Sequence, residues 1–333
     1  MSLPPIEIPL GAMRFNSDSQ KLEYWNGSAW FQIHTFSPNL DGGARGCFGG
    51  SYPSQKDTIN FVTISTAGIA LDFGNLTVSR GSLDAAGSST RGFWCGGEHP
   101  AKDEIDFITI SSTGNATDFG NLTVARFGPA AGSNSTRAVI AGGNYPKTNV
   151  IDYVTMTSAG NALDFGDLKT GFRRSNAGNS PTRVIFYGGT DSPSSNADTV
   201  IQFTTTATLG NTQDFGDTFN GGYSRAQGAI CSSTRALFAG VGSPQSNNIE
   251  FITMSTLGNG TLFGDLPFAA SARCAGRSGC SSVTRGLTAG GGSSDVSIDY
   301  ISITTGGTAA DFGDLTENLE YGAGCSNGHG GLG

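Results

Sequence analysis

The chain has 333 residues, of which 51 are glycine and only 14% are charged, against about a quarter in an average soluble domain. Its net charge of −8 argues against binding to a nucleic-acid backbone, which requires clustered Lys and Arg. No stretch approaches the ~18 consecutive apolar residues of a membrane-spanning helix, and the first residues lack the basic start of a signal peptide. We therefore expect neither membrane insertion nor a nucleic-acid partner.

Residues 1–38 read as a small β module that the rest of the chain does not repeat. Residues 13–15, 22–25 and 29–33 predict three strands, residues 16–19 predict a turn, and Asn26-Gly27 predicts a two-residue hairpin turn. A three-stranded sheet cannot bury this many aromatic rings alone, so it must pack on the rest of the chain, on its own copies or on a partner. The residues expected at this attachment or oligomer interface are Phe15, Tyr24, Trp25, Trp30 and Phe31.

From residue 39 to residue 333 the chain is repetitive. A Phe-Gly pair ends the same short phrase six times, at steps of 46 to 50 residues. A period of this length indicates one repeated supersecondary unit. The six pairs begin at Phe73, Phe119, Phe165, Phe215, Phe263 and Phe312.

Each unit predicts four strands, here called a to d, as residues 130–168 illustrate. Small residues form strand a, an Arg opens the apolar strand b, and a double glycine ends it; a polar loop then precedes the alternating strand c, and strand d carries the Phe-Gly. Four short antiparallel strands per unit are typical of a β-propeller blade. Small residues suit the innermost strand near the axis, and the Phe suits an apolar position between neighbouring sheets.

The order of these marks resembles the kelch motif. In the second unit the double glycine is followed by an alternating strand and then by Phe119, Leu122 and Arg126. The resemblance covers about residues 39–333 and departs from the family in having Phe where Trp is usual. It implies an all-β fold, a six-bladed kelch-like β-propeller beside the small N-terminal three-stranded module, and no particular chemistry.

The two ends of the repeat region predict how the ring closes. The first unit has almost no strand a before Arg45, whereas residues 321–327 form a strand a with no strand b behind it. We expect this C-terminal strand to pair into the first blade and so to remove two open sheet edges.

The N-terminal module resembles a segment of tailed-bacteriophage fibre and virion proteins. The matching residues are Gly11 to Asn16, Lys21 to Gly27 and Trp30, and the Asp-Phe-Gly-Asn-Leu repeats resemble those of marine phage structural proteins. The resemblance implies a non-enzymatic virion protein, a fibre, spike or appendage subunit made in the host cytoplasm. It would dock to other virion proteins and to copies of itself, as a trimer, through residues 1–38. Its propeller would meet a host-surface saccharide or protein.

The loops between strands b and c vary while their surroundings repeat, which favours them as binding loops on a rigid scaffold. Aromatic faces with polar rims suit saccharides. The candidate binding residues in these loops are Tyr52, His99, Lys102, Tyr145 and Lys147. Different readings are a cellular propeller that serves as a protein-interaction or carbohydrate-binding module, and a propeller enzyme.

Catalytic, metal and cofactor sites are not expected. The three histidines lie in linker, loop and tail, so no catalytic triad is assembled. The polar second position of strand c is expected to face solvent rather than bind Ca²⁺. It is Asp106, Asp152 and Asp299 in three units, and Asn60, Gln202 and Glu250 in the other three. The Arg that opens strand b is expected either to pair with the Asp before Phe-Gly, partly exposed, or to cap backbone carbonyls. The six cysteines are expected to be unpaired core residues.

Overall fold

The computed structural model describes residues 8–16, 21–32, 44–98, 100–190, 197–220, 230–240, 246–270, 274–292 and 294–332. The chain divides into two compact units, residues 1–41 and 42–333. In the first unit, β1 (Met13–Asn16), β2 (Lys21–Trp25) and β3 (Trp30–Gln32) form one antiparallel sheet in that order. This confirms the three predicted strands.

The loop between β2 and β3 is longer than predicted. Trp25 pairs with Trp30, so the loop holds four residues and not two. The side-chain Oδ1 of Asn26 accepts from the backbone N–H groups of Ser28 and Ala29, at 2.9 and 2.8 Å. The expectation of a two-residue turn was wrong because the Asn side chain bonds to its own loop and so stabilises a wider turn. The other predicted turn falls on residues 17–20, outside the described ranges.

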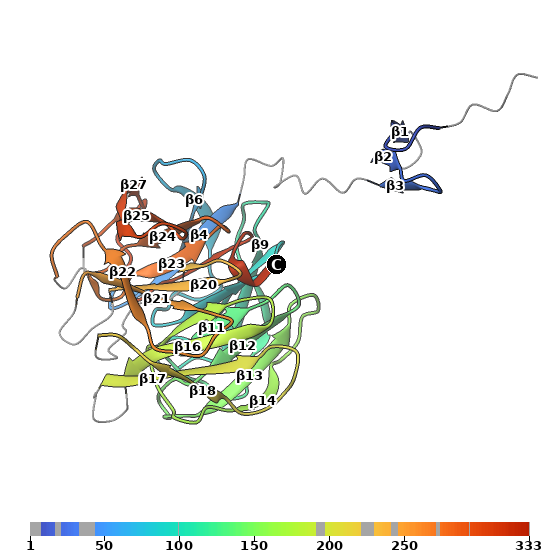
Figure 1. Cartoon of the computed structure of the whole chain (residues 1–333). Coiled ribbons are helices and arrows are strands. Elements are labelled where there is room, and N and C mark those ends of the chain that lie inside the picture. Colours follow the sequence, from blue (N-terminus) through green and yellow to red (C-terminus); the bar gives the residue numbers. More distant parts are fainter. Residues whose placement is uncertain are drawn as a thin grey trace, which may run out of the picture. The chain divides into compact units, whose positions relative to one another are not determined.

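The second unit is built of small sheets that each repeat the predicted order a–b–c–d (Figure 1). Over the residues that the structure describes there are six, called sheets 1 to 6 in chain order, and consecutive strands pair antiparallel. From strand a to strand d the bounds are β28 (Ala323–Ser326), β4 (Arg45–Ser51), β5 (Lys56–Thr63) and β6 (Leu71–Asn75) in sheet 1; β7 (Asp84–Gly87), β8 (Arg91–Cys95), β9 (Glu104–Thr109) and β10 (Thr117–Asn121) in sheet 2; β11 (Ala130–Ser133), β12 (Arg137–Ala141), β13 (Val150–Thr155) and β14 (Leu163–Asp167) in sheet 3; β15 (Asn176–Asn179), β16 (Arg183–Thr190), β17 (Ala197–Thr205) and β18 (Gln213–Asp217) in sheet 4; β19 (Ile230–Cys231), β20 (Arg235–Ala239), β21 (Asn248–Thr253) and β22 (Thr261–Asp265) in sheet 5; and β23 (Ser278–Ser281), β24 (Arg285–Ala289), β25 (Ser297–Ser302) and β27 (Ala310–Asp314) in sheet 6.

Two further elements complete the second unit. The short strand β26 (Gly307–Thr308) pairs in parallel with β22 and so extends sheet 5 with a piece of the chain of sheet 6. A single 3₁₀ turn, η2 (Gly330–Leu332), follows β28.

The C-terminal strand pairs with the start of the repeat region, as predicted. β28 is antiparallel to β4, with Ala323 opposite Gly49 and Ser326 opposite Gly46. Sheet 1 is therefore assembled from both ends of the second unit, and β4 lies between β28 and β5 with no open edge.

Each Phe-Gly pair forms a β-bulge. In sheet 2, Asp118 pairs with Asp106 and Gly120 with Ile105, which leaves Phe119 as the extra residue of β10. A bulge re-aims the side chain of the inserted residue, and Phe119 is 3% exposed and packs among residues of sheets 2 and 3. The same shift recurs between strands c and d of the other five sheets, and five of the six Phe rings are buried; Phe263 is half-buried. The prediction that these rings lie between neighbouring sheets is confirmed.

The glycine of each pair allows the next sheet to approach. Gly74 has φ +144°, and a Cβ there would lie 2.4 Å from the carbonyl oxygen of Gly114 in sheet 2. The N–H of Gly114 in turn donates to the carbonyl of Phe73 at 2.8 Å. Any other residue at position 74 would separate the two sheets.

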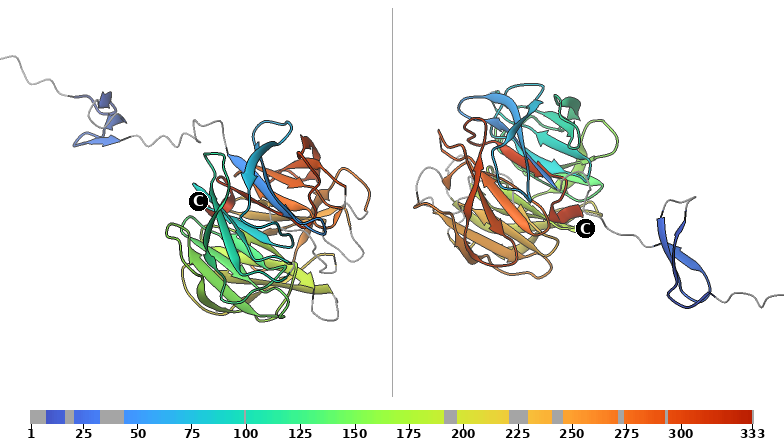
Figure 2. Two further views of the ribbon diagram at one scale, coloured as in Figure 1. Left: turned by 180° about the vertical axis from the view of Figure 1, so that it is seen from behind. Right: turned by 90° about the horizontal axis from the view of Figure 1, so that it is seen from above.

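The sheets pack against one another in a blade-like arrangement (Figure 2). Six apolar clusters fill the spaces between consecutive sheets, and one of them joins Phe312 and Leu287 of sheet 6 to Phe48 and Ile64 of sheet 1. The a strands contact one another in the order β28, β7, β11, β15, β19, β23 and back to β28. Their residues are small and buried, as the sequence predicted.

The arginine that opens each strand b links its own sheet to the next one. The Arg91 guanidinium lies 4.9 Å from the centroid of the Phe107 ring, and its Nη1 donates to the carbonyl of Met156 in sheet 3 at 2.8 Å. The Asp before the Phe-Gly is exposed in the five sheets that have it. Of the two alternatives, capping of backbone carbonyls is therefore the one observed. The corresponding bonds are from Arg45 to Ile110, Arg137 to Thr206, Arg183 to Met254, Arg235 to Ile303 and Arg285 to Ile64.

The polar second position of strand c is buried, and the expectation that it faces solvent was wrong. Asp106 is 0% exposed, accepts from the N–H and hydroxyl of Thr77 at 3.0 and 2.6 Å, and pairs with the buried Arg80 at 3.1 Å. Strand c is covered by a neighbouring sheet on both faces, so its alternation of polar and apolar residues does not indicate a solvent face. The other buried members are Asn60, Asp152, Gln202, Glu250 and Asp299.

All six cysteines are unpaired and buried, as expected. Burial raises the pKa of the Cys95 and Cys231 thiols to about 12. These thiols therefore remain protonated and unreactive at neutral pH.

Candidate ligand-binding cavity

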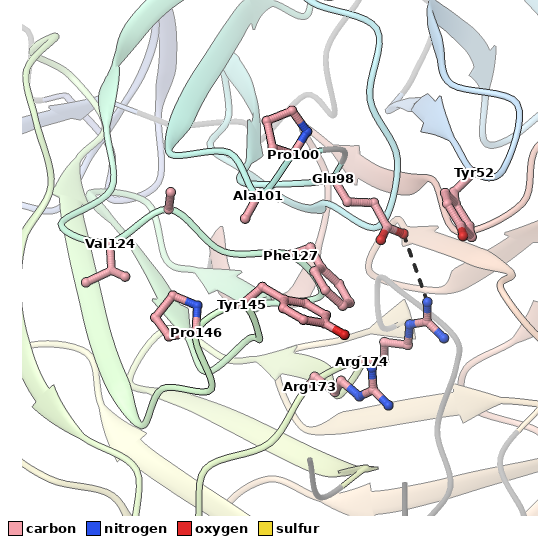
Figure 3. Close-up of a pocket in the computed structure, with 11 residues that line it drawn as sticks. Tyr52, Glu98, Pro100, Ala101, Val124, Phe127, Tyr145, Pro146, Arg173 and Arg174 are labelled. Atoms are coloured by element: carbon pink, nitrogen blue, oxygen red, sulfur yellow. Dashed lines mark ion pairs between the residues drawn. The ribbon is translucent and has the colours of Figure 1, made fainter. Parts of the chain in front are cut away.

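One large cavity opens among the b–c loops and d–a connections of sheets 1 to 4, with a volume of about 770 Å³. This volume lies within the usual range for small-ligand sites. Figure 3 shows how its walls come from five separate segments. The lining residues are Tyr52, Glu98, Pro100, Ala101, Val124, Ala125, Phe127, Tyr145, Pro146, Arg173 and Arg174.

Backbone bridges hold these segments in place. After the d strands of sheets 1, 2 and 3, the connection pairs with the residue after a double glycine: Gly81 with Glu98, Phe127 with Asn144 and Arg173 with Thr190. Both residues of the double glycine have positive φ, +68° and +125° at Gly96 and Gly97. A Cβ on Gly96 would lie 2.7 Å from the carbonyl of Arg126, so only glycine lets strand b end this close to the next connection.

A second set of bonds joins the connections to one another. Four N–H to carbonyl hydrogen bonds of 2.7 to 2.9 Å follow one another, each from a residue of one connection to a residue of another. They run from Arg174 to Gly128, from Gly128 to Ser82, from Ser82 to Tyr321 and from Tyr321 to Gly276. All five residues have positive φ. The backbone below the cavity is thus fixed by hydrogen bonds, and its side chains project from a rigid base.

Tyr145 presents an exposed aromatic face inside this cavity. Its ring stacks on Phe127 with centroids 5.2 Å apart and planes inclined by 27°; Phe127 is buried, whereas Tyr145 is 70% exposed. Tyr145 also has φ +56°, a backbone conformation that costs a non-glycine residue about 1–3 kcal/mol. One face of the ring is held by Phe127, and the other is available to a ligand.

Charged groups line the inner wall of the same cavity. Glu98 accepts a hydrogen bond from the hydroxyl of Ser82 and pairs with Arg174, whose Nη2 lies 4.0 Å from its Oε1. The Arg174 guanidinium lies 4.6 Å from the centroid of Tyr321, which in turn contacts Tyr52 edge-on at 6.2 Å. Among the lining residues that the structure describes, the charged groups are Glu98, Arg173 and Arg174.

Two of the five predicted loop residues, Tyr52 and Tyr145, are brought together in this cavity. Lys102 and Lys147 do not line it: Lys102 pairs with Glu104 at 3.3 Å, and Lys147 is exposed. His99 lies outside the described residues.

The sequence prediction missed Phe127, Arg173 and Arg174, which belong to d–a connections. The sequence did carry a signal, because this position of the repeat changes from one repeat to the next. It is Gly81 in the first repeat and Phe127 in the second, and the third repeat has the pair Arg173-Arg174 there. Departures from the repeat in the d–a connections were as informative as those in the b–c loops.

The space among the a strands is too small to hold a ligand. The cavity among the a strands measures about 20 Å³, enough for roughly one water molecule. His329 lies beside it, with Nε2 2.7 Å from the carbonyl of Gly87 and Nδ1 2.7 Å from Nδ2 of Asn179. These partners match a neutral imidazole protonated at Nε2, and burial lowers the pKa of His329 to about 4. In the described part of the chain, no group of three or more His, Cys, Asp or Glu side chains is arranged to hold a metal ion.

The predicted interface residues of the N-terminal module lie on two faces of its sheet. The register places Phe15, Tyr24 and Phe31 on one face with Met13, each at least 40% exposed. Trp25 and Trp30 lie on the opposite face, half-buried, with ring centroids 5.6 Å apart. Arg14 covers Trp30 at 4.2 Å and pairs with Glu23 at 2.9 Å. The apolar face is therefore formed by Met13, Phe15, Tyr24 and Phe31.

No helix in the described ranges is long and apolar enough to cross a membrane. Comparison with protein-family models and with curated proteins finds no match for this chain.

Proposed function

We propose that the second unit is a closed six-bladed β-propeller that binds a saccharide on a host-cell surface through the cavity between its first blades. Closure is supported by three independent sets of contacts that run in cyclic order: the apolar clusters, the a strands and the Arg–carbonyl bonds. The pairing of β28 with β4 is the latch.

Saccharide binding rests on one observation above all, the exposed face of Tyr145. Sugar rings stack their apolar C–H faces on aromatic rings and use the surrounding polar groups for orientation. Tyr145 is held on Phe127, its backbone is fixed, and Glu98 and the two arginines lie on the wall beside it (Figure 3). A fixed ring costs little conformational entropy on binding.

We propose further that the protein is a virion component, a fibre, spike or appendage subunit of a tailed bacteriophage that docks through residues 1–38. The support is the sequence resemblance of that module together with its apolar face of Met13, Phe15, Tyr24 and Phe31. Scattered apolar residues are ordinary on a surface, but four on one face of a three-stranded sheet mark an interface. The partners would be other virion proteins and further copies of the chain.

The binding proposal is tested on an array of immobilised bacterial and algal polysaccharides probed with the purified full chain. We expect at least one saccharide to be bound and its binding to be lost in Tyr145→Ala. The matched control is Leu163→Ala, which removes an exposed apolar side chain from β14, outside the cavity; Leu163 is 59% exposed and Tyr145 70%. Binding that survives Tyr145→Ala, or binding to none of the saccharides, contradicts the proposal.

The attachment proposal is tested by the mass in solution of the full chain and of a chain lacking residues 1–38. We expect the full chain to self-associate and the shortened chain to be monomeric, and we expect Phe15→Ser with Phe31→Ser to reproduce the effect of the deletion. A full chain that stays monomeric and does not copurify with phage particles would favour the cellular alternative.

A further inference from the structure

The side chains of the cavity wall indicate which class of saccharide the cavity would bind. Arg174 is largely buried, with 16% of its side chain exposed, and it lines the cavity. Among the residues described, its guanidinium donates no hydrogen bond: its Nε has no partner, and its distance of 4.0 Å to Glu98 is too long for one. Donors of a largely buried guanidinium that no protein group accepts are left to water or to a ligand in the cavity.

The other contacts of Arg174 hold its guanidinium in one orientation but do not accept its hydrogen-bond donors. Its guanidinium lies 4.6 Å from the centroid of Tyr321 and 5.9 Å from that of Phe127. Stacking on ring faces leaves the N–H edge of a guanidinium available for a planar acceptor. The carboxylate of Glu98 lies 4.0 Å away and accepts from the Ser82 hydroxyl, so it partly offsets the charge of Arg174 without accepting a hydrogen bond from it.

Arg173 adds a second cation to the same wall. Figure 3 shows the hydroxyl end of the Tyr145 ring turned towards the part of the cavity where Arg173 and Arg174 lie. Among the lining residues that the structure describes there are thus two guanidinium groups and the carboxylate of Glu98. An anionic ligand would gain charge-assisted, bidentate hydrogen bonds from the unused donors of Arg174, which are stronger than those of a neutral acceptor.

We propose that the cavity binds an acidic saccharide, with the sugar ring on Tyr145 and its carboxylate or sulfate on Arg174 and Arg173. This inference rests on the proposed saccharide-binding function and specifies its ligand. In such a saccharide the acid group and the ring that stacks on the aromatic side chain belong to the same or to neighbouring sugar units. The cavity likewise holds the Tyr145 ring and the two arginines close together. Carboxylate and sulfate share the chemistry that the arginines recognise, and the experiment separates them.

The test uses pairs of oligosaccharides that differ only in charge. Oligogalacturonate, hyaluronan oligosaccharides and sialyllactose are each compared with the methyl ester of the same sugar, and sulfated oligosaccharides with their desulfated forms. We expect at least one acidic member to bind at least tenfold more tightly than its neutral partner, and its affinity to fall as salt is raised.

The variants separate charge from geometry. Arg174→Gln is expected to reduce binding of the acidic sugar at least tenfold and to leave the neutral partner unchanged, and Arg174→Lys is expected to give an intermediate affinity. The control is Lys169→Gln, which removes an exposed cation outside the cavity; it should have no effect. Thermal unfolding of each variant verifies that it is folded.

Two results overturn the inference and differ in what they leave standing. If acidic and neutral members bind equally, or if Arg174→Gln leaves the preference intact, the inference fails and saccharide binding through Tyr145 stands. If no saccharide of either kind binds, both the inference and the proposed function fail.

Discussion

Arg285, the first residue of β24, donates from Nη1 to the carbonyl oxygen of Ile64 at 3.2 Å, although the two residues are 221 positions apart. Arg91 makes the same kind of bond to Met156 only 65 positions along the chain. The same local device therefore joins adjacent sheets within the chain and the last sheet to the first.

The first prediction compares these two arginines. If the ring is closed, Arg285→Ala and Arg91→Ala remove equivalent interactions, each a charge-assisted hydrogen bond worth about 1.5–3 kcal/mol and a cation–π contact worth about 0.5–1 kcal/mol before allowance for solvent. We expect each substitution to lower the free energy of unfolding by about 1–3 kcal/mol, measured by urea denaturation. A negligible effect of Arg285→Ala beside a clear effect of Arg91→Ala would indicate an open arrangement.

The second prediction concerns the C-terminal strand. Deleting residues 320–333 removes β28 and leaves β4 as an open edge. It also removes Ala323 and Cys325 from their cluster with Trp94. We expect the free energy of unfolding to fall by more than about 5 kcal/mol, a large share of the stability of an ordinary domain, and the melting temperature followed by circular dichroism to fall with it.

The control for that deletion is removal of residues 1–38, which belong to the other compact unit. This truncation should leave the main thermal transition where it is. A C-terminal truncation that melts at the temperature of the full chain would contradict the role assigned to β28.

The strands were predictable from the sequence because each one carries a local signal. Alternation marks strand c, small residues mark strand a, and Asp-Phe-Gly encodes a bulge whose Phe enters the core wherever it occurs. The pairing of β28 with β4 followed from counting strands, since one unit lacked what the chain end supplied.

The cavity could be predicted only in part, because its walls depend on which loops meet. Tyr52 and Tyr145 were found as loop residues that depart from the repeat, but their convergence with Arg174 requires the backbone bonds between connections. The burial of Asp106 was missed for a related reason. A strand that is covered on both faces still alternates between polar and apolar residues. The partner of Asp106, Arg80, lies 26 residues earlier, in the connection between β6 and β7.

The third prediction contrasts two buried carboxylates at equivalent positions. Asp106→Asn leaves Arg80 buried without its counter-charge, so we expect a loss of about 3–5 kcal/mol in the free energy of unfolding. Among the described residues no Lys or Arg pairs with Glu250; burial raises its pKa, and it accepts from the Tyr187 hydroxyl and the Phe219 N–H. Glu250→Gln keeps these bonds, and Gln202 fills the corresponding place in sheet 4.

We therefore expect Glu250→Gln to change the free energy of unfolding at pH 7 by less than about 1 kcal/mol or to increase it. A raised pKa means that the folded protein holds the Glu250 proton more tightly than the unfolded chain, so the wild type loses stability as pH rises above the unfolded value. The advantage of Glu250→Gln should grow in that direction, which urea denaturation at pH 5 and pH 8 measures. Equal losses in Asp106→Asn and Glu250→Gln would contradict the different roles of the two carboxylates.

The last prediction concerns His329 and acid. Its folded pKa of about 4 lies below the unfolded value of 6.5, so between these values the unfolded chain binds a proton that the folded protein does not. Stability from this residue is complete above pH 6.5 and is lost as pH falls towards 4, at about 1.4 kcal/mol per pH unit and about 3 kcal/mol in all.

Buried Asp84, whose pKa burial raises to about 8, acts in the opposite direction, so the wild type alone does not reveal the effect. The difference in free energy of unfolding between wild type and His329→Gln cancels Asp84 and every other shared group. We expect that difference to be constant above pH 7 and to shift by about 3 kcal/mol against the wild type between pH 6.5 and pH 4. A difference that does not vary with pH would mean that His329 takes up its proton without leaving Gly87 and Asn179, and would contradict the neutral state assigned to it.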